Sequence, residues 1–314
     1  MKPFAFTLAI VLAAGASTTA LAQTADKDVA IQDMKSKKLK GMKKIFVEQF
    51  TVNFALKQTA NASSSALRSS AKSVVSVAAA LGVSTETLQG ITDRAYAIFL
   101  EKAKANGFEV VDQSILAALP VYDPDNKRPY APIAMPEDIS KEDIVCATAA
   151  PQGFTNLIPT KNPMKLIKGF KGQDVLAIKS NLNVSFVDFA TRSSKIGVNA
   201  KINWKEDIAL SAGIACPLKI FGGIGATNVM TQAYTQMGYG FSVGLKQDLK
   251  TGNELGEWVE TYDSQIGLLG YNSKFSGQVL KIDQAQYAEA VLAQVNRYWD
   301  YYFQELVRVT SEAE

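Results

Sequence analysis

Three short segments of the chain carry residue types that bind ligands or do acid–base chemistry. Segment 221–228 (FGGIGATN) offers flexible backbone amides that could cradle a phosphate, but it lacks the terminal Gly-Lys-Ser/Thr of a phosphate-binding loop. Asp123, Asp125 and Asn126 have part of a calcium-loop spacing without its distal bidentate glutamate. A third group consists of the carboxylates Glu137, Asp138, Glu142 and Asp143. Burial could separate the pKa values of two of these carboxyls, so that one acts as a general acid and the other as a general base. We expect a flexible turn, an Asx/Pro turn and a solvated helix start at these places, and hence no catalytic, cofactor-binding or metal-binding residue.

The chain contains no histidine among its 314 residues. Catalysis by Ser-His-Asp or Cys-His groups, zinc bound by histidine and haem with a histidine axial ligand are therefore excluded. An enzyme that uses two carboxylates needs no histidine, so that class stays open. We expect a protein that binds a partner, without a cofactor, rather than an enzyme.

The two cysteines of the chain, Cys146 and Cys216, form a candidate disulfide bridge. Such a bridge would stabilise the chain by roughly 4 kcal/mol in the chain-entropy model, because it closes a long loop. Two buried free thiols are the alternative, since distance and orientation decide whether a bridge can form. Without histidine or a C-x-x-C spacing, the pair indicates neither a zinc site nor a thioredoxin-like motif.

Aromatic residues are concentrated near the carboxyl end of the chain. Positions 298–303 (YWDYYF) hold more rings than a single buried stripe of the predicted helix needs. We expect Trp299 to face the core, and Tyr298 and Tyr301 to face outward, where exposed tyrosines anchor interfaces. Tyr298 and Tyr301 are thus the predicted partner-binding residues, and ordinary packing of all these rings is the alternative.

Residues 1–22 have the organisation of a secretory signal peptide. Lys2 provides the positive charge, residues 4–14 the apolar core, and Ala20-Leu21-Ala22 the cleavage site. Cleavage after Ala22 would leave Gln23 as the first residue of a periplasmic or secreted protein. An uncleaved anchor is the alternative, although the apolar run is shorter than the ~20 residues that span a bilayer. No later segment is long and apolar enough to cross a membrane, so we expect no integral membrane insertion.

Segment 23–43 is polar and basic, and we expect a solvated lead-in there. No acid interrupts its lysine run before Glu48, and the run comprises Lys35, Lys37, Lys38, Lys40, Lys43 and Lys44. Such a run could contact anionic lipid headgroups, a polyanionic cell-wall polymer or nucleic acid. Because export removes most roles in nucleic-acid binding, we expect no nucleic-acid partner.

Segment 44–119 has the pattern of a first α/β part. Residues 45–56 alternate as in a strand, and 73–77 could return as its hairpin partner, although 78–81 could equally prolong a helix. Ser84 is a predicted N-cap for a helix that ends in a basic turn before Gly107. A short buried strand at 108–112 and one or two helical turns at 113–119 follow.

The rest of the chain is expected to be mostly sheet. Segment 120–163 holds most of the ten prolines and predicts a long irregular connection. In segment 164–314 we expect a brief helix, a final helix after Asp283, and strands at 174–178, 182–189, 196–204, 208–214, 240–247 and 258–262. The predicted fold is α+β, with a mixed, largely antiparallel sheet backed by helices and a long C-terminal helix. Segments 44–119 and 164–314 are expected to complete one domain together.

Three segments carry a resemblance to a known family. Segment 44–50 (KIFVEQF) precedes a helix and the segment 107–112 (GFEVVD), and a later strand begins with 172–178 (GQDVLAI). This order resembles the periplasmic α/β family that includes the curli-secretion channel subunit and the outer-membrane activators of penicillin-binding proteins. The resemblance implies an envelope protein that acts in assembly or secretion. The chain departs from the family in lacking a lipidation cysteine after the signal peptide, so membrane attachment and pore formation are not implied.

The sequence therefore predicts an exported, non-catalytic envelope protein that binds a protein or a cell-wall component. A carboxylate-dependent periplasmic enzyme, or a binding protein for a glycan or small molecule, is the alternative. Oligomerisation is compatible with either class.

Overall fold

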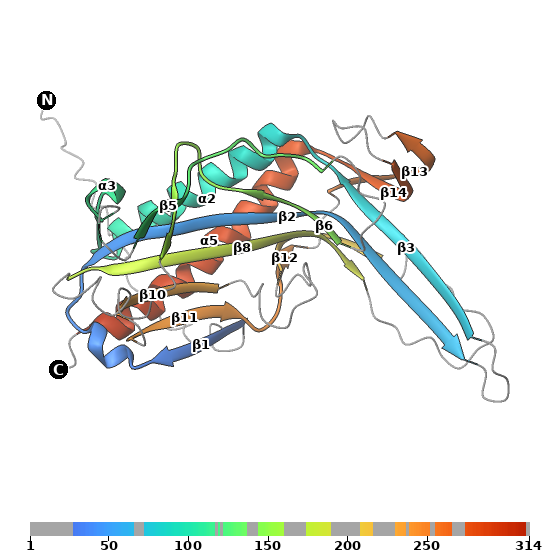
Figure 1. The fold of residues 1–314 in the computed structure, drawn as a ribbon. Coiled ribbons are helices and arrows are strands. Elements are labelled where there is room, and N and C mark those ends of the chain that lie inside the picture. The colour runs from blue at the N-terminus through green and yellow to red at the C-terminus, as the bar shows by residue number, and fades with distance from the viewer. Residues whose placement is uncertain are drawn as a thin grey trace, which may run out of the picture.

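Figure 1 shows the computed structural model of the chain, which describes residues 28–65, 72–116, 119, 122–136, 144–159, 174–189, 208–215, 230–236, 239–251, 255–265 and 274–311. Within these ranges a mixed sheet lies against two long helices, so the predicted α+β fold with a long C-terminal helix is confirmed. The strands follow the order β1-β11-β10-β8-β2-β3-β14-β13, and β4, β6, β9 and β12 pair at the sides of this path.

The central strand of the sheet is β2 (Lys44–Ser65), whose alternating apolar residues are typical of a strand. On one edge β2 pairs in parallel with β8 (Leu176–Phe189) and then antiparallel with β3 (Lys72–Gly82). On the other edge it pairs with β4 (Glu109–Val110) and with β6 (Ile144–Ala149). The predicted hairpin of β2 and β3 is confirmed, and it extends as an arm beyond the rest of the sheet (Figure 1).

The remaining strands of this sheet are added mainly by antiparallel pairing. β11 pairs with β1 and β10, and β10 pairs with β8. β9 pairs with the later part of β8 and with β12, while β14 lies parallel to β3 and antiparallel to β13. Their bounds are Val29–Met34 (β1), Ile208–Ile214 (β9), Met230–Gln236 (β10), Tyr239–Leu245 (β11), Leu249–Thr251 (β12), Gly256–Gln265 (β13) and Lys274–Ile282 (β14).

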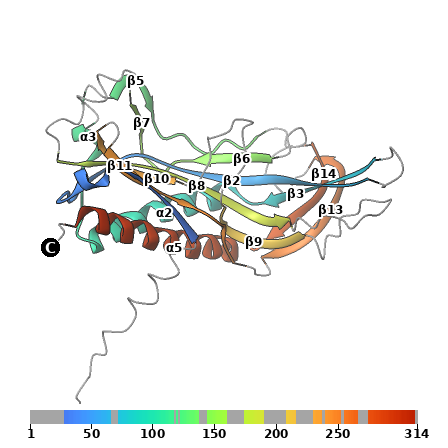
Figure 2. The same cartoon turned by 90° about the horizontal axis from the view of Figure 1, so that it is seen from below.

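Two long helices cover one face of the sheet (Figure 2). α2 (Thr85–Ala105) begins where Ser84 Oγ accepts a backbone N–H of the first turn at 3.1 Å, and it ends before Gly107, whose φ of +78° reverses the chain. α5 (Gln284–Thr310) begins at Asp283, whose carboxylate accepts two N–H groups of the next turn at 2.9 and 3.0 Å. Both predicted helix starts are confirmed.

Aromatic rings fill the core between the helices and the sheet. Trp299 of α5 is fully buried, as predicted, with its ring 5.1 Å from that of Phe99 in α2 and 6.0 Å from that of Phe50 in β2. The Trp299 indole N–H donates to the Ala95 C=O at 3.2 Å. One cluster of buried apolar residues extends from Val29 to Val309. Segments 44–119 and 164–314 both contribute to it and therefore share one core.

A small second sheet packs on the face of the main sheet opposite the helices (Figure 2). It consists of β5 (Tyr122–Arg128) and β7 (Asn156–Pro159), and Tyr122 contacts Phe46 of β2 with ring centroids 5.8 Å apart. One or two helical turns are expected at 113–119, and α3 (Gln113–Leu116) supplies one turn there.

The predicted solvated lead-in is wrong in its described part. β1 forms an edge strand on β11, and η1 (Ser36–Leu39) follows it with Leu39 fully buried. The Gly41 N–H then donates to the Thr310 C=O at the end of α5 at 2.8 Å. Strand pairing and one buried leucine hold this segment in the fold. These features have little effect on the composition of the segment, so its high lysine content wrongly indicates a solvated linker.

The predicted irregular connection at 120–163 is also wrong, because it contains three strands. β6 occupies a proline-free stretch, β7 ends at Pro159, and the pairing of β5 shifts register in the part that contains Pro124. The sequence also fails to predict β1, β10 and β14. The expected helix near 163–169 and the expected strand at 196–204 lie outside the described residues.

β8 is one continuous strand where two separate strands are expected. The polar residues at the expected break pair across the sheet: Ser180 Oγ lies 3.1 Å from Thr231 Oγ1, and Thr51 Oγ1 donates to Asn181 Oδ1 at 3.0 Å. Polar side chains with cross-strand partners stabilise the strand here rather than end it.

Candidate functional site

One edge of β2 is interrupted between β4 and β6. β4 pairs only with the first two residues of β2, and β6 pairs from Val52 onward. Side chains fill the gap, because Gln113 donates to the Val47 C=O at 3.3 Å and the Phe50 N–H donates to Asn156 Oδ1 at 2.8 Å. Side chains, and not a paired strand, therefore satisfy these backbone groups of β2.

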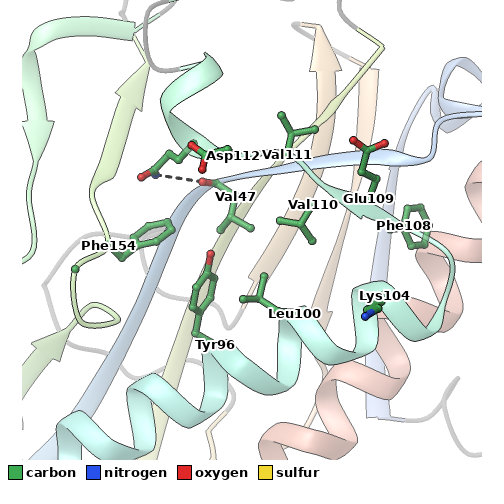
Figure 3. Close-up of a pocket in the computed structure, with 12 residues that line it drawn as sticks. Val47, Tyr96, Leu100, Lys104, Phe108, Glu109, Val110, Val111, Asp112 and Phe154 are labelled. Atoms are coloured by element: carbon green, nitrogen blue, oxygen red, sulfur yellow. Dashed lines mark hydrogen bonds between the residues drawn. The ribbon is translucent and has the colours of Figure 1, made fainter.

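A cavity of about 630 Å³ lies beside this gap, between β2, β4 and α2 (Figure 3). Its apolar lining consists of Val47, Tyr96, Leu100, Phe108, Val110, Val111 and Phe154. Polar side chains in the lining are Lys104, Glu109, Asp112 and Gln113. An apolar wall with a few polar groups is typical of a ligand-binding pocket.

Helical spacing and a glycine turn place the pocket residues. Tyr96, Leu100 and Lys104 recur at every fourth position and so share one side of α2. The turn after α2 brings β4 back alongside β2. Gly153, with φ of +74°, allows the next turn to place the Phe154 ring 5.3 Å from that of Tyr96.

The Tyr96 hydroxyl is a polar group within this largely apolar wall. Burial raises the pKa of Tyr96 to about 12, so the phenol stays neutral at neutral pH and can donate a hydrogen bond. Figure 3 shows it pointing from α2 toward β2, and it has no hydrogen-bond partner within the described part of the chain. A ligand in the pocket could therefore gain a hydrogen bond from Tyr96.

Charged residues and one exposed valine form the rim of the pocket. Asp112 accepts hydrogen bonds from the Ser114 hydroxyl and N–H at 2.6 and 2.7 Å, which lower the pKa of Asp112 and keep it ionised at neutral pH. Lys104 and Glu109 are exposed, and Val110 is 36% exposed. The expected burial of the strand at 108–112 is thus wrong for β4, which lies at an edge of the sheet.

A buried carboxylate lies near the second sheet. Glu48 is fully buried, at a break in the register between β2 and β8, and a strand bulge of this kind re-aims a side chain. Its carboxylate lies 3.8 Å from Lys179 Nζ. Burial and the neighbouring Glu48 raise the pKa of Tyr122, so that phenol is neutral. These contacts hold Glu48 in place.

The structure corrects the predicted outward orientation of Tyr298 and Tyr301. Tyr298 is fully buried, and its hydroxyl lies 3.0 Å from Thr231 Oγ1 and 2.9 Å from the Val243 C=O. Tyr301 is 4% exposed, and its hydroxyl donates to Asp28 at 2.8 Å. α5 is surrounded by the sheet, α2, η1 and the start of β1, so rings on several sides of it are buried.

The other candidate residues are not brought together at the pocket. Cys146 lies in β6 opposite Ala55, whereas Cys216 lies outside the described residues, so their bridge stays a prediction. Asp123, Asp125 and Asn126 belong to β5. Segments 137–143 and 221–228 also lie outside the described residues. In the part of the chain that the structure describes, no three cysteine or carboxylate side chains are grouped as metal ligands, and no helix is long and apolar enough to cross a membrane.

Sequence reasoning missed the pocket as a site. The signal that could have indicated it is the spacing of Tyr96, Leu100 and Lys104, which adds a second stripe to α2 beside the core stripe. Residues 107–112 are part of the family resemblance, but the sequence indicates no role in binding for them. Their position beside α2 depends on contacts that are distant in sequence.

The fold and the pocket define an α+β protein whose mixed sheet carries helices on one face and a pocket at an interrupted edge. In comparisons with known proteins, no family model, curated protein or solved structure matches the chain. The resemblance to the periplasmic family of the curli-secretion channel subunit therefore stays a prediction.

Proposed function

We propose that this chain is an exported, non-catalytic envelope protein that binds a partner polypeptide in the pocket beside β2. The observation that carries the proposal is Val110, a large apolar side chain that is 36% exposed at the mouth of an apolar pocket. Val110 belongs to the wall of this pocket, and a concave, largely apolar site with a few polar groups is typical of binding sites. The signal-peptide pattern of residues 1–22 supports export.

The pocket is suited to an apolar side chain of the partner. Its volume of about 630 Å³ is within the range of ligand-binding cavities. Leu100 and Phe154 would contact the inserted side chain, while Tyr96 could donate a hydrogen bond to the partner backbone. Lys104 and Asp112 at the rim would select partner segments with charges of opposite sign next to the apolar anchor.

Crosslinking from the pocket mouth tests this proposal. A photoreactive residue at position 110 should crosslink the mature protein to one defined polypeptide in envelope extract, and Val110→Ser should weaken capture of that polypeptide. Ile31 is the matched control, because it is the other large apolar residue found exposed in the described ranges, at 43%, and it lies on β1. Equal capture by Val110→Ser and by Ile31→Ser, with both variants folded, would reject the pocket as the binding site.

A further inference from the structure

We propose that the end of the molecule formed by η1 is a docking surface for an anionic lipid bilayer. This surface, the basic end, consists of Lys35, Lys37, Lys38, Lys40, Lys43 and Lys44, all of which are exposed. The role proposed for the basic end is separate from partner binding in the pocket. The choice of a bilayer as its partner rests on the export proposed above. Figure 1 places it at one end of the elongated molecule and the β2–β3 arm at the other.

The lysines are held on a folded scaffold. Lys35 has a left-handed backbone with φ of +59°, which turns the chain from β1 into η1. Leu39 is fully buried, and the Gly41 N–H is bonded to the Thr310 C=O at 2.8 Å. The charges are therefore concentrated at a fixed place on the surface, where they sum to a stronger local potential than a freely moving tail would give.

No carboxylate within the described ranges forms an ion pair with these six lysines. Two of them contact aromatic rings: Lys35 Nζ lies 5.7 Å from the Tyr239 ring centroid, and Lys43 Nζ lies 5.3 Å from that of Phe108. A contact with an aromatic ring does not neutralise the ammonium group, so both lysines keep their positive charge.

Carboxylates on neighbouring elements offset this charge only in part. Near the ends of the two helices, Asp300 is bound by Lys102, and Glu305 is bound by Arg308. Glu109 is exposed and pairs in register with Lys44, and exposed Asp174 precedes β8, whose Leu176 pairs with Ile45, so both acids lie next to the patch. Within the described ranges, these two exposed carboxylates against six lysines leave a net positive charge at this end.

The arrangement favours a bilayer over a linear polyanion. The lysines belong to one short stretch of chain, on η1, on the turns beside it and at the start of β2, so they are gathered at one end of the molecule and do not extend along its length as a track for a polymer would. Lysine is attracted to anionic headgroups as a point charge without a specific geometry. Peripheral docking through this end would leave the arm pointing away from the membrane.

Vesicle co-sedimentation of the full mature protein tests the proposal. The protein should bind phosphatidylcholine vesicles that contain phosphatidylglycerol, should not bind pure phosphatidylcholine vesicles, and should be released by added salt. Each lysine near an anionic surface contributes about fivefold in affinity, so Lys37→Gln, Lys38→Gln and Lys40→Gln together should weaken binding about a hundredfold.

The matched control removes the same number of positive charges elsewhere. It combines Arg128→Gln, Lys246→Gln and Lys281→Gln, all at exposed positions outside the basic end, and should bind anionic vesicles like the parent. Equal loss in both triple variants would mean that only net charge matters and would overturn the proposal. Soluble polyphosphate that binds the parent more tightly than the vesicles do would overturn it in favour of a polymer. Val110→Ser should retain vesicle binding, so failure of the pocket proposal is distinguishable.

Discussion

Asp28→Asn is the most informative change to the fold, because Asp28 joins the first described residues to the C-terminal helix. Asp28 is 5% exposed and accepts hydrogen bonds from Tyr301 at 2.8 Å, from Arg297 at 2.5 Å and from Gln247. Asparagine keeps the shape and an acceptor oxygen but removes the charge. We therefore expect a loss of stability that is centred on β1, without a loss of the fold.

The size of the loss follows from the contacts of Asp28. A hydrogen bond to a charged group contributes about 1.5–3 kcal/mol and one between neutral groups about 0.5–1.5 kcal/mol, so removing the charge costs about 1 kcal/mol at the buried Tyr301 contact. The Arg297 contact adds less, because 47% of that side chain is exposed and water screens the pair. The expected decrease in the free energy of unfolding at neutral pH is about 1–2 kcal/mol.

The effect of Asp28→Asn should depend on pH. Burial raises the pKa of Asp28, but hydrogen bonds from Tyr301 and Gln247 and the Arg297 guanidinium outweigh it, so the pKa lies below 3.8 in the folded protein. A carboxyl whose pKa is depressed on folding stabilises the protein above its unfolded pKa and loses that contribution as pH falls through the folded value. The difference between parent and variant should therefore be full at neutral pH and should shrink below pH 3.8.

Urea unfolding across this pH range measures the difference directly, and hydrogen exchange of β1 shows where it acts. Asp300→Asn is the control, because Asp300 also forms an ion pair, with Lys102, but its side chain is 50% exposed. Its cost should stay below about 1 kcal/mol. An Asp28→Asn cost that matches this control, or that persists unchanged in acid, would refute the assigned role of the buried charge.

Three further predictions concern the core, the cysteines and export. Trp299→Ala should cost about 3–5 kcal/mol in urea unfolding, because the ring is fully buried against Phe99; a cost near 1 kcal/mol would contradict this packing. If Cys146 and Cys216 are bridged, the denatured, non-reduced protein should resist thiol alkylation, and alkylation of both thiols would exclude the bridge. Amino-terminal sequencing of the exported protein should begin at Gln23, and an intact chain retained in the cytoplasm would contradict export.

The helix boundaries could be predicted from the sequence because they depend on neighbouring residues. Ser84 and Asp283 satisfy N–H groups within the first helical turn, and Gly107 adopts the left-handed conformation that ends α2. The alternation in β2 likewise indicates a strand whatever its partners are. The α+β class follows from these local signals.

The orientation of the aromatic residues could not be predicted, because it depends on what surrounds α5. Helical spacing alone separates Trp299 from Tyr298 and Tyr301, yet all three are buried. Tyr301 is covered because Asp28, far away in the sequence, lies against it. A helix at the protein surface buries one stripe of side chains against the core, whereas a helix with neighbours on several sides buries more of its side chains.

The sequence by itself determined the helix starts, the central strand and the lysine run. Only the tertiary structure decided that the run is folded, that Ser180 and Asn181 continue β8, and that Val110 is exposed at a pocket. The physical reason is the range of the interactions: caps and alternation act between residues close in the chain. The pocket, in contrast, is assembled from β2, α2, β4 and the turn at Gly153, whose contacts form only when the whole chain folds.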